Sequence, residues 1–466
     1  MILRGSLWAM IPAKGMKVRA AFALGCALAL VGCNGGGSKG EADAPESAPV
    51  AKADSLKGDL EVVAFKGGYG IDYYVNVAKD LEAKNPGLKV TVSGDPRVWE
   101  KLRPRLISGD PPDLMLPGWG MDHWALIQDD ALFQLDAALD GPGPDGKGKW
   151  RDSFKPDILK LGQKDGKTYT LPYYVSLQGW WYDPGVFAKH GWTPPKTYPE
   201  LLTLCEKIKA AGIAPITYQG QYPYYMIDGV LMPWAMSVGG KSAIDAAQNL
   251  EPGAWSSPAF LKAAQMIDEL NKKGYLQKGA SGMSHTESQT QFLNGKAAMI
   301  PCGTWLETEM KKVMPSGASV RYFLPPVAPD GKGDPTTVMI GVEPWMIPAG
   351  AKHPEAAVAF FRCMTSVPVA RKFIEEKGTL MAVEGASDGA KLPPSLEAPA
   401  EVFKNAKTVY ADQVRSWYPA FGKEVEGAMT ALLSGELTPQ GFVDRCEAAA
   451  KKTREDSSIP KYKVGA

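Results

Sequence analysis

Residues 60–87 read LEVVAFKGGYGIDYYVNVAKDLEAKNPG, and this stretch sets the pattern of the chain. The short β-branched run from Leu60 to Phe65 predicts a buried strand, and the glycines that follow it predict a turn. From residue 71 the apolar side chains recur at helical spacing until Asn85, Pro86 and Gly87 end the helix. The predicted order is strand, glycine-rich turn, helix.

The same order repeats farther along the chain. A second strand is predicted from Leu88 to Ser93, a helical segment around Trp99 to Ile107, and a third strand from Asp113 to Leu116. Strands that alternate with helices predict an α/β fold with a parallel sheet, in which ligands bind at the carboxyl ends of the strands. The loops after the first and third strands carry Tyr69 and Trp119, so we expect both side chains to face a cleft.

Beyond the glycine- and proline-rich loop at 141–148, two strands are predicted at 167–171 and 173–182, on either side of Pro172. The second strand alternates, with one face made of Val175, Leu177 and Trp181 and the other of Ser176, Gln178, Trp180 and Tyr182. Polar groups and aromatic rings therefore share one side of this strand.

The later segments continue the alternation. Helices are predicted to begin at Pro184 and at Tyr198, where Thr197 and Glu200 provide a capping pair. A strand at 297–302 leads into a turn at Gly303, and another strand at 338–347 contains Glu343 and Trp345. A further helix is predicted from Pro354, and the remainder of the chain is mostly helical.

Composition narrows the class of partner. The 466 residues suffice for two domains, and 52 Lys and Arg against 51 Asp and Glu give a net charge of +1. No basic stripe interleaved with aromatics is present, so nucleic acid is not an expected partner. The 4 His have no metal-ligand spacing, and we expect no metal and no cofactor. Free thiols and one disulfide both remain open for the cysteines of the main body, which are Cys205, Cys302, Cys363 and Cys446.

Tryptophan is prominent, with 13 residues, many of them beside Gly, Pro or polar neighbours. A flat apolar ring with polar groups at its edge suits stacking against the face of a sugar. The rings in such settings include Trp119 in PGWG, Trp180 in QGWWYD, Trp305 in CGTW and Trp345 in EPW. For each ring taken alone, packing in the core is the alternative interpretation.

The start of the chain matches a bacterial lipoprotein signal. Lys17 and Arg19 precede an apolar run at 20–30, and the tetrad LVGC ends in Cys33. Residues 1–33 are therefore predicted to be a signal peptide with Cys33 lipidated, and residues 34–56 a flexible spacer. Met16 is an alternative start to Met1, because the residues before it add nothing that a signal needs. The predicted location is outside the cytoplasm, on the cell surface or in a periplasm, with the lipid as the only contact with the membrane.

Several motifs follow one another in a recognisable order: LEVVAFKGGYG, KNPGLKV, GDPPDLML, YTLPYYVSLQGWWYDPGVFAKHGWTPPKTYPELL, FLNGKAAMIPCGTW, IPAGAKHPEAAVAFF and LLSGELTPQGF. In these motifs the chain resembles the extracellular solute-binding proteins of ATP-driven carbohydrate importers, a family that includes the maltose-binding proteins. Three further stretches, ITYQGQYPYY, NLEPGAW and SHTESQTQFLNGKAAMIPCGTWLETEM, are similar to the branch that binds N-acetylglucosamine and its β-linked dimer, chitobiose.

The resemblance implies a periplasmic-binding-protein type II fold, in which two α/β lobes joined by a hinge close on a ligand in the cleft between them. Lobe 1 is expected from residues 57–173 and 341–387, and lobe 2 from residues 174–335 and 390–466. Positions that match ligand-contacting positions of the family are Gly68, Tyr69, Ser176, Gln178 and Trp305. Further candidates, chosen because they lie near the expected crossings or loops, are Glu343, Trp345, Trp119, Trp180, Tyr222, Tyr224, Trp234 and Trp417.

We therefore expect a monomeric sugar-binding component of an ABC importer that delivers its ligand, foremost N-acetylglucosamine or chitobiose, to the transmembrane permease subunits. It is not expected to be an enzyme. The alternative is an extracellular glycan hydrolase, since two carboxylates across a cleft suffice for that chemistry. However, the sequence has no HExxH motif, and its GxSxG match at 36–40 lies in the spacer and not after a strand. A structural or adhesion lipoprotein would explain the lipid anchor but not the alternation of strands and helices.

Overall fold

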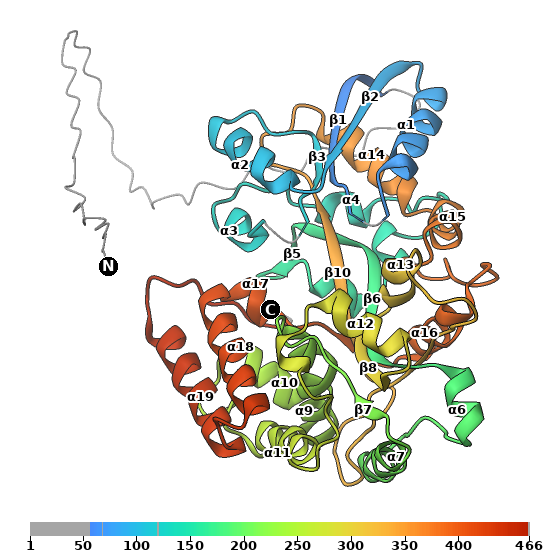
Figure 1. The fold of residues 1–466 in the computed structure, drawn as a ribbon. Coiled ribbons are helices and arrows are strands. Elements are labelled where there is room, and N and C mark those ends of the chain that lie inside the picture. The colour runs from blue at the N-terminus through green and yellow to red at the C-terminus, as the bar shows by residue number, and fades with distance from the viewer. Residues whose placement is uncertain (1–55, 68, 119–120, 465–466) are drawn as a thin grey trace, which may run out of the picture. The chain divides into compact units, whose positions relative to one another are not determined.

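The computed structural model describes residues 56–67, 69–118 and 121–464. The signal peptide, Cys33, almost all of the predicted spacer, Gly68 and Trp119 lie outside these residues. The predicted alternation at the start of the main body is confirmed, as Figure 1 shows. It consists of β1 (Lys57–Phe65), α1 (Asp72–Lys84), β2 (Gly87–Asp95), α2 (Val98–Ser108) and β3 (Leu114–Leu116).

The remaining elements continue in the same mixed manner. The strands are β4 (Gln163–Lys164), β5 (Lys167–Thr168), β6 (Thr170–Tyr182), β7 (Ala214–Ile216), β8 (Ala297–Gly303), β9 (Arg321–Phe323), β10 (Val338–Met346), β11 (Leu380–Met381) and β12 (Val409–Tyr410). The α-helices are α3 (His123–Gln128), α4 (Asp136–Asp140), α5 (Pro156–Lys160), α6 (Pro184–His190), α7 (Tyr198–Ala210), α8 (Tyr224–Met226), α9 (Met232–Gly239), α10 (Lys241–Gln248), α11 (Pro258–Lys272), α12 (His285–Leu293), α13 (Leu306–Met310), α14 (Pro354–Met364), α15 (Val367–Lys377), α16 (Pro394–Asn405), α17 (Val414–Trp417), α18 (Pro419–Ser434) and α19 (Pro439–Glu455). The described residues also form the 3₁₀ turns η2 (Trp150–Ser153) and η4 (Ala280–Gly282) and the π-turn η3 (Ile227–Leu231).

Several helices begin where the sequence places a cap. The side chain of Asp183 accepts hydrogen bonds from the backbone of Gly185 and Val186 at the start of α6. Thr197 and Glu200 form the predicted capping box of α7, with Pro199 in its first turn. These local signals are strong because each satisfies backbone N–H groups that have no partner inside the helix.

Ten strands of the described residues form one mixed sheet, in which β2, β1, β3, β10, β6, β8 and β7 lie side by side in that order. Strand β1 is parallel to both β2 and β3, which confirms the predicted parallel arrangement for this part. Strand β10 returns antiparallel to β3 and β6, and β7 is parallel to β8. The α/β prediction is therefore correct, with an antiparallel centre between two parallel flanks.

Strand β6 belongs to both flanks of the sheet. Residues 170–177 pair with β10, and residues 178–182 pair with β8 and, over the last three, with β9. The prediction of two strands separated by Pro172 is wrong, because β6 runs through this residue. Pro172 lies opposite Pro344 at a register shift of β10, so two residues that cannot donate a hydrogen bond face each other. The predicted lobe boundaries at 173/174 and 341 fall within β6 and β10 and stay a prediction.

Side chains of the described residues form two buried clusters, and neighbouring residues of one strand contribute to different clusters. On β6, Trp180 packs with α7, α9 and α11, whereas Trp181 packs in the other cluster with Val175 and Leu177. On β1, Val63 joins the first cluster and Val62 the second. The alternation predicted for β6 is therefore confirmed, and the sheet separates the two clusters.

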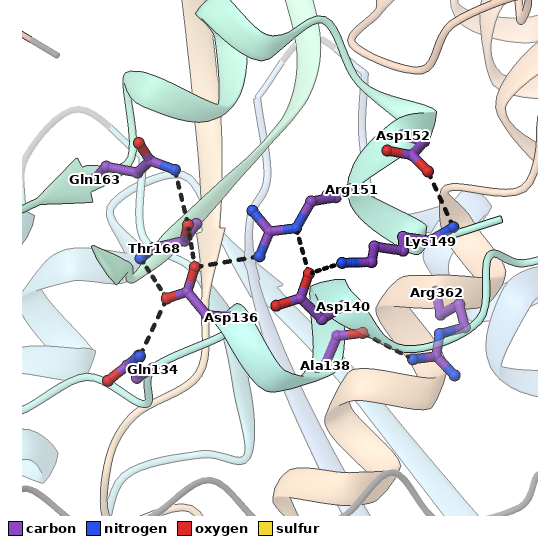
Figure 2. A network of polar contacts seen from close by, with 10 residues as sticks. All are labelled: Gln134, Asp136, Ala138, Asp140, Lys149, Arg151, Asp152, Gln163, Thr168 and Arg362. Atoms are coloured by element: carbon purple, nitrogen blue, oxygen red, sulfur yellow. Dashed lines mark hydrogen bonds and ion pairs between the residues drawn. The ribbon is translucent and has the colours of Figure 1, made fainter. Parts of the chain in front are cut away.

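A polar network fixes the segment that leads into β6 (Figure 2). The carboxylate of Asp136 on α4 accepts hydrogen bonds from the backbone N of Thr168 at 2.8 Å and from its hydroxyl at 3.1 Å. Arg151 bridges Asp136 and Asp140, with 2.8 Å between its Nε and Asp140 Oδ1. Arg362 of α14 donates to the carbonyl of Ala138 in the middle of α4. Strand β5, which leads into β6, is thus held by α4, which is itself bound to α14.

The four cysteines that the structure describes are free thiols, and three of them are buried: Cys205, Cys302 and Cys446. Burial raises the pKa of the thiol of each cysteine, including Cys363. Across the described ranges, no group of His, Cys, Asp and Glu is arranged to hold a metal ion. In the same ranges, none of the helices has the length and apolar character needed to cross a membrane.

Close packing of β6 against β9 gives a first prediction. A Cβ at Gly179 would lie 2.0 Å from the ring of the buried Tyr322, whose hydroxyl donates to the carbonyl of Gln178 at 2.9 Å. Gly179→Ala should therefore lower the free energy of unfolding by about 1–3 kcal/mol through overpacking. Urea unfolding followed by circular dichroism measures this. Gly282→Ala is the control, because a Cβ at Gly282 meets nothing within 4 Å, and an equal loss in both variants would contradict the prediction.

Candidate functional site

The candidate site is built around the point where β6 changes partners. Ser176 pairs with Gly341 of β10, and its hydroxyl donates to the Gly341 carbonyl at 3.3 Å. A Cβ at Gly341 would lie 2.8 Å from that hydroxyl oxygen, so the glycine leaves room for it. Gln178 pairs with Gly303 of β8 and is buried. Its side-chain amide can donate and accept, so it suits a ligand with hydroxyl or carbonyl groups.

Glu343 brings a buried carboxyl group to the same region. It lies on β10 between Val342 and Pro344, where the register with β6 shifts, and such bulges redirect side chains. Its exposed fraction is 7%. Burial raises the pKa of Glu343 to about 7, and a hydrogen bond with the Tyr174 side chain opposes this rise. The carboxyl group therefore changes charge near neutral pH.

Tyr69, in the turn after β1, lies against other rings. Its ring centroid is 5.0 Å from that of Tyr174 and 5.9 Å from that of Phe373, both in edge-to-face geometry. Its hydroxyl is hydrogen-bonded to the side chain of Thr379, and burial raises the pKa of Tyr69 to about 12. The charge of Glu343 also raises this pKa, which associates Tyr69 with the carboxyl group on β10. The tyrosine is thus fixed and uncharged.

A second aromatic group lies on the β8 side. Tyr224 stacks on Tyr225 with 4.7 Å between the centroids, and Tyr222 contacts Tyr224 at 6.1 Å. Tyr225 meets Trp305 edge-to-face at 6.0 Å. The Trp305 ring is partly exposed and lies against Gly303, where a Cβ would be 1.9 Å from the ring. The turn after β8 therefore requires glycine to hold the tryptophan in this position.

Charged side chains lie next to the ring of Tyr224. The guanidinium of Arg415 on α17 lies 4.7 Å from the centroid of the Tyr224 ring, which is cation–π geometry. Arg415 also forms ion pairs with Asp228 of η3 and with Asp412. Burial raises the pKa of Asp228, and the positive charge of Arg415 opposes this rise. Two carboxylates thus offset one guanidinium, and the group offers no free positive charge to an anionic ligand.

Glu309 of α13 connects the two aromatic groups. Its carboxylate accepts a hydrogen bond from Gln289 at 2.8 Å and lies 3.4 Å from His285. Its charge raises the pKa of both Tyr69 and Tyr225, so it lies within electrostatic reach of a ring from each group. Glu309 is therefore a charged group that influences both Tyr69 and Tyr225.

The structure places other predicted ligand residues in the core. Trp180, Trp234 and Trp345 have exposed fractions of 0% and present no free ring face. The indole N–H of Trp180 donates to the carbonyl of Gly229, and that of Trp234 donates to the carbonyl of Pro326. Trp417 is also buried. The surroundings of these rings are therefore those of core residues. We leave Trp180, Trp234 and Trp345 out of the site. Gly68 and Trp119 lie outside the described residues.

Several groups of the site were not identified from the sequence: Tyr174, Phe373, Thr379, Glu309, Asp228 and Arg415. For two of them the sequence contains a feature that could have pointed to the site. Glu309 follows the CGTW turn by one helical turn, and Arg415 lies two residues before the candidate Trp417. Phe373 and Thr379 had none, since only the folded chain brings α15 to Tyr69.

The buried carboxyl group gives a second prediction. The pKa of Glu343 is higher in the folded protein than its ordinary value of 4.5, so the folded state binds more protons between pH 4.5 and about 7. The contribution of Glu343 to stability therefore falls as the pH rises through this range. Glu343→Gln should raise the free energy of unfolding at pH 8 by on the order of 1–3 kcal/mol and leave it nearly unchanged at pH 4.

Urea unfolding at both pH values measures the effect. Glu436→Gln, which changes an exposed glutamate, is the control and should show no such pH-dependent gain. A Glu343→Gln variant that is less stable than the parent at pH 8 would contradict the conclusion that burial disfavours the charged form of Glu343.

Comparison with known proteins places this geometry in context. The sequence model of a family described as "Bacterial extracellular solute-binding protein" matches residues 67–370. The chain is 28% identical over 445 residues to the "Diacetylchitobiose binding protein NgcE" of Streptomyces coelicolor, covering 92% of this chain and 91% of that protein. It is 26% identical over 326 residues to the "Multiple sugar-binding protein" of Streptococcus mutans, covering 68% of this chain and 73% of the relative.

A solved structure shares the fold. It is titled "Chitin oligosaccharide binding protein" and superposes with a TM-score of 0.69 over 85% of this chain and 98% of its own, at 23% sequence identity. At this level of identity the likeness concerns the fold. The predicted fold class, that of two-lobed solute-binding proteins, is therefore confirmed, and no more than the fold follows from this superposition.

Proposed function

Because the chain belongs to the bacterial extracellular solute-binding protein family, we propose that it captures N-acetylglucosamine or its β-linked dimer, diacetylchitobiose, and delivers the sugar to an ABC importer. The family and its sugar-binding relatives bind solutes for import, and the chain is a binding protein and not an enzyme. The match to a diacetylchitobiose-binding protein over 92% of the chain supports this choice of sugar most directly.

The chemistry of the site agrees with a neutral, hydroxyl-rich ligand. Partly exposed Trp305 offers an apolar ring for the C–H face of a sugar, and Gln178 and Glu309 offer groups for its hydroxyls. The amide of Gln178 can both donate and accept, so it suits either a hydroxyl or an acetamide group. Arg415 is offset by two carboxylates, which favours a sugar without negative charge.

We propose that the two halves of the sheet act as lobes, with residues 57–173 and 341–387 in one and residues 174–335 and 390–466 in the other. Tyr69 and Glu343 would meet the ligand from the first lobe, and Tyr222, Tyr224 and Trp305 from the second. A sugar that contacts both lobes stabilises the closed arrangement over the open one, and this difference is what a permease can recognise. In this proposal the chain acts as a monomer.

The alternative of a glycan hydrolase is not favoured. The two relatives and the solved structure described above are named as binding proteins. Two carboxyl groups of the site, Glu343 and Glu309, are each hydrogen-bonded to a neighbouring side chain. Incubation of the purified protein with chitin oligosaccharides should therefore leave the sugars intact, which chromatography of the mixture measures, whereas released products would overturn the proposal.

The ring of Trp305 gives a third prediction. Trp305→Ala removes the stacking surface and should weaken binding of diacetylchitobiose by on the order of 1–3 kcal/mol. Isothermal titration calorimetry with diacetylchitobiose, N-acetylglucosamine and maltose measures the affinities. Trp192→Ala is the control, because this tryptophan is similarly half-buried but stacks on His190 beside α6. An unchanged dissociation constant in a folded Trp305→Ala protein would remove Trp305 from the site, and no binding of any sugar by the parent would refute the function.

The predicted lipid anchor gives a fourth prediction. We propose that Cys33 is acylated and holds the protein on the outer side of a bacterial membrane. Cys33→Ser should move the protein from the detergent phase to the aqueous phase in Triton X-114 partitioning of whole cells, because the acyl chains supply its hydrophobic contact with the membrane. Cys26→Ser is the control, since this cysteine lies within the predicted signal peptide. A Cys33→Ser protein that stays in the detergent phase would contradict the anchor.

A further inference from the structure

The segment that follows α19 is bound to distant parts of the protein near its end, at Tyr462 and Val464. We call residues 457–464 the strap. The backbone N of Tyr462 donates to the hydroxyl of Tyr418 at 2.9 Å, and the backbone N of Val464 donates to Asn249 Oδ1 at 2.8 Å. Tyr462 has an exposed fraction of 7%, although it lies outside any helix or strand. The strap is thus anchored at Tyr418, between α17 and α18, and at Asn249, just after the end of α10.

The ring of Tyr462 joins two tryptophans from distant parts of the chain. It stacks on Trp417 of α17 with 5.7 Å between the centroids, and it meets Trp124 of α3 edge-to-face at 5.0 Å. The two tryptophans also contact each other at 5.6 Å. The hydroxyl of Tyr462 donates to the carbonyl of Trp124 at 3.5 Å. Three segments, α3, α17 and the strap, therefore meet in one aromatic cluster, and Figure 1 shows α3 next to α17.

Contacts between the aromatic rings hold this cluster together. Trp124 and Trp417 are 2% and 6% exposed, and neither indole N–H has a hydrogen-bond partner among the described residues. Ring contacts, without help from these donors, therefore hold the tryptophans together. Removal of the third ring should loosen the contact between α3 and α17, because Tyr462 touches both of the other two.

The cluster is connected to the candidate site through α17. This helix spans only Val414–Trp417, and Arg415, which lies under the ring of Tyr224, is two residues from Trp417. A single turn of helix cannot move at one end without moving the other. The position of Trp417 thus influences the position of Arg415, and through it Tyr224 and Asp228.

We propose that the strap is a latch that ties α3 to α17 and thereby positions Arg415 and Tyr224 for the ligand, so that Tyr462 is a positioning residue for sugar binding. This inference rests on the proposed function. In the lobe assignment proposed above, α3 belongs to the first lobe, and α17 and the strap belong to the second. The latch therefore acts between elements that would move relative to each other when the ligand is bound or released.

The test compares Tyr462→Ala with Tyr462→Phe, which keeps the ring, and with Lys463→Ala, which changes an exposed neighbour. Calorimetry with diacetylchitobiose gives the affinities. Tyr462→Ala should weaken binding about tenfold, because it removes the ring contacts with Trp124, Trp417 and Tyr418, whereas the other two variants should bind like the parent. If Tyr462→Ala does not fold, Tyr462→Leu takes its place, since leucine keeps apolar volume but has no planar ring.

A double-mutant cycle distinguishes a positioning role of Tyr462, exerted through α17, from a purely structural role. If Tyr462 acts through α17, Tyr462→Ala should cost little further affinity in a Trp417→Ala background. The same tenfold loss in both backgrounds would overturn the proposal, as would unchanged affinity of the single variant.

A second measurement needs no sugar. Amide hydrogen exchange should increase in both α3 and α17 in Tyr462→Ala, because the latch joins these helices. Unchanged protection of α3 would overturn the latch. If the parent binds none of the sugars tested, the proposed function fails, and the exchange result alone then decides whether the latch stands.

Discussion

The pairing of β6 with two different sets of strands is the constraint on which the rest of the structure depends. One continuous strand supplies hydrogen bonds to β10 over its first part and to β8 and β9 over its second. Several groups of the site are placed by it: Ser176 and Gln178 lie on it, Glu343 lies at the register shift of its partner β10, and Gly303 ends its other partner, β8, just before Trp305. Where Pro172 faces Pro344, neither residue can donate a backbone hydrogen bond. The register of the two strands shifts at this point, and Glu343 therefore lies outside the regular pairing of β10 with β6.

The electrostatics of the site have two sources. Burial shifts the pKa values of its ionisable groups, and the charge of Arg415 is paired with nearby carboxylates. Burial raises the pKa of Glu343 to about 7, Tyr69 is held uncharged, and Arg415 is offset by Asp228 and Asp412. A strongly charged ligand would have to replace one of these paired partners, which is costly in a desolvated site. A neutral ligand rich in hydroxyl groups meets no such cost, since each hydroxyl can donate to a carboxylate or accept from a carboxylic acid. The charge distribution thus favours the same ligand class as the aromatic rings.

The sequence predicted most of the fold because its signals are local. Glycine and proline at the ends of α1 and α7, the capping pair of Thr197 and Glu200, and the alternation of β6 each act within a few residues. The same reasoning was wrong at Pro172, where a second proline 172 residues later makes a strand possible. It also could not separate buried from exposed tryptophans. Trp180 lies in the stretch QGWWYD, next to a glycine, but the carbonyl that accepts a hydrogen bond from its indole N–H belongs to the distant Gly229.

Long-range contacts of this kind explain why the candidate site could be predicted only in part. Tyr69 and Trp305 follow strands and could be found from their turns, whereas Arg415 reaches Asp228 across 187 positions of sequence and Tyr462 reaches Trp124 across 338. Such contacts depend on how helices near the end of the chain return to the sheet, which no short motif encodes. The short helix α17 is the clearest case, because four residues carry both an ion pair under Tyr224 and a tryptophan bound to α3. Groups that contact a ligand directly can be recognised from local sequence, while the groups that hold them in place are determined by the tertiary fold.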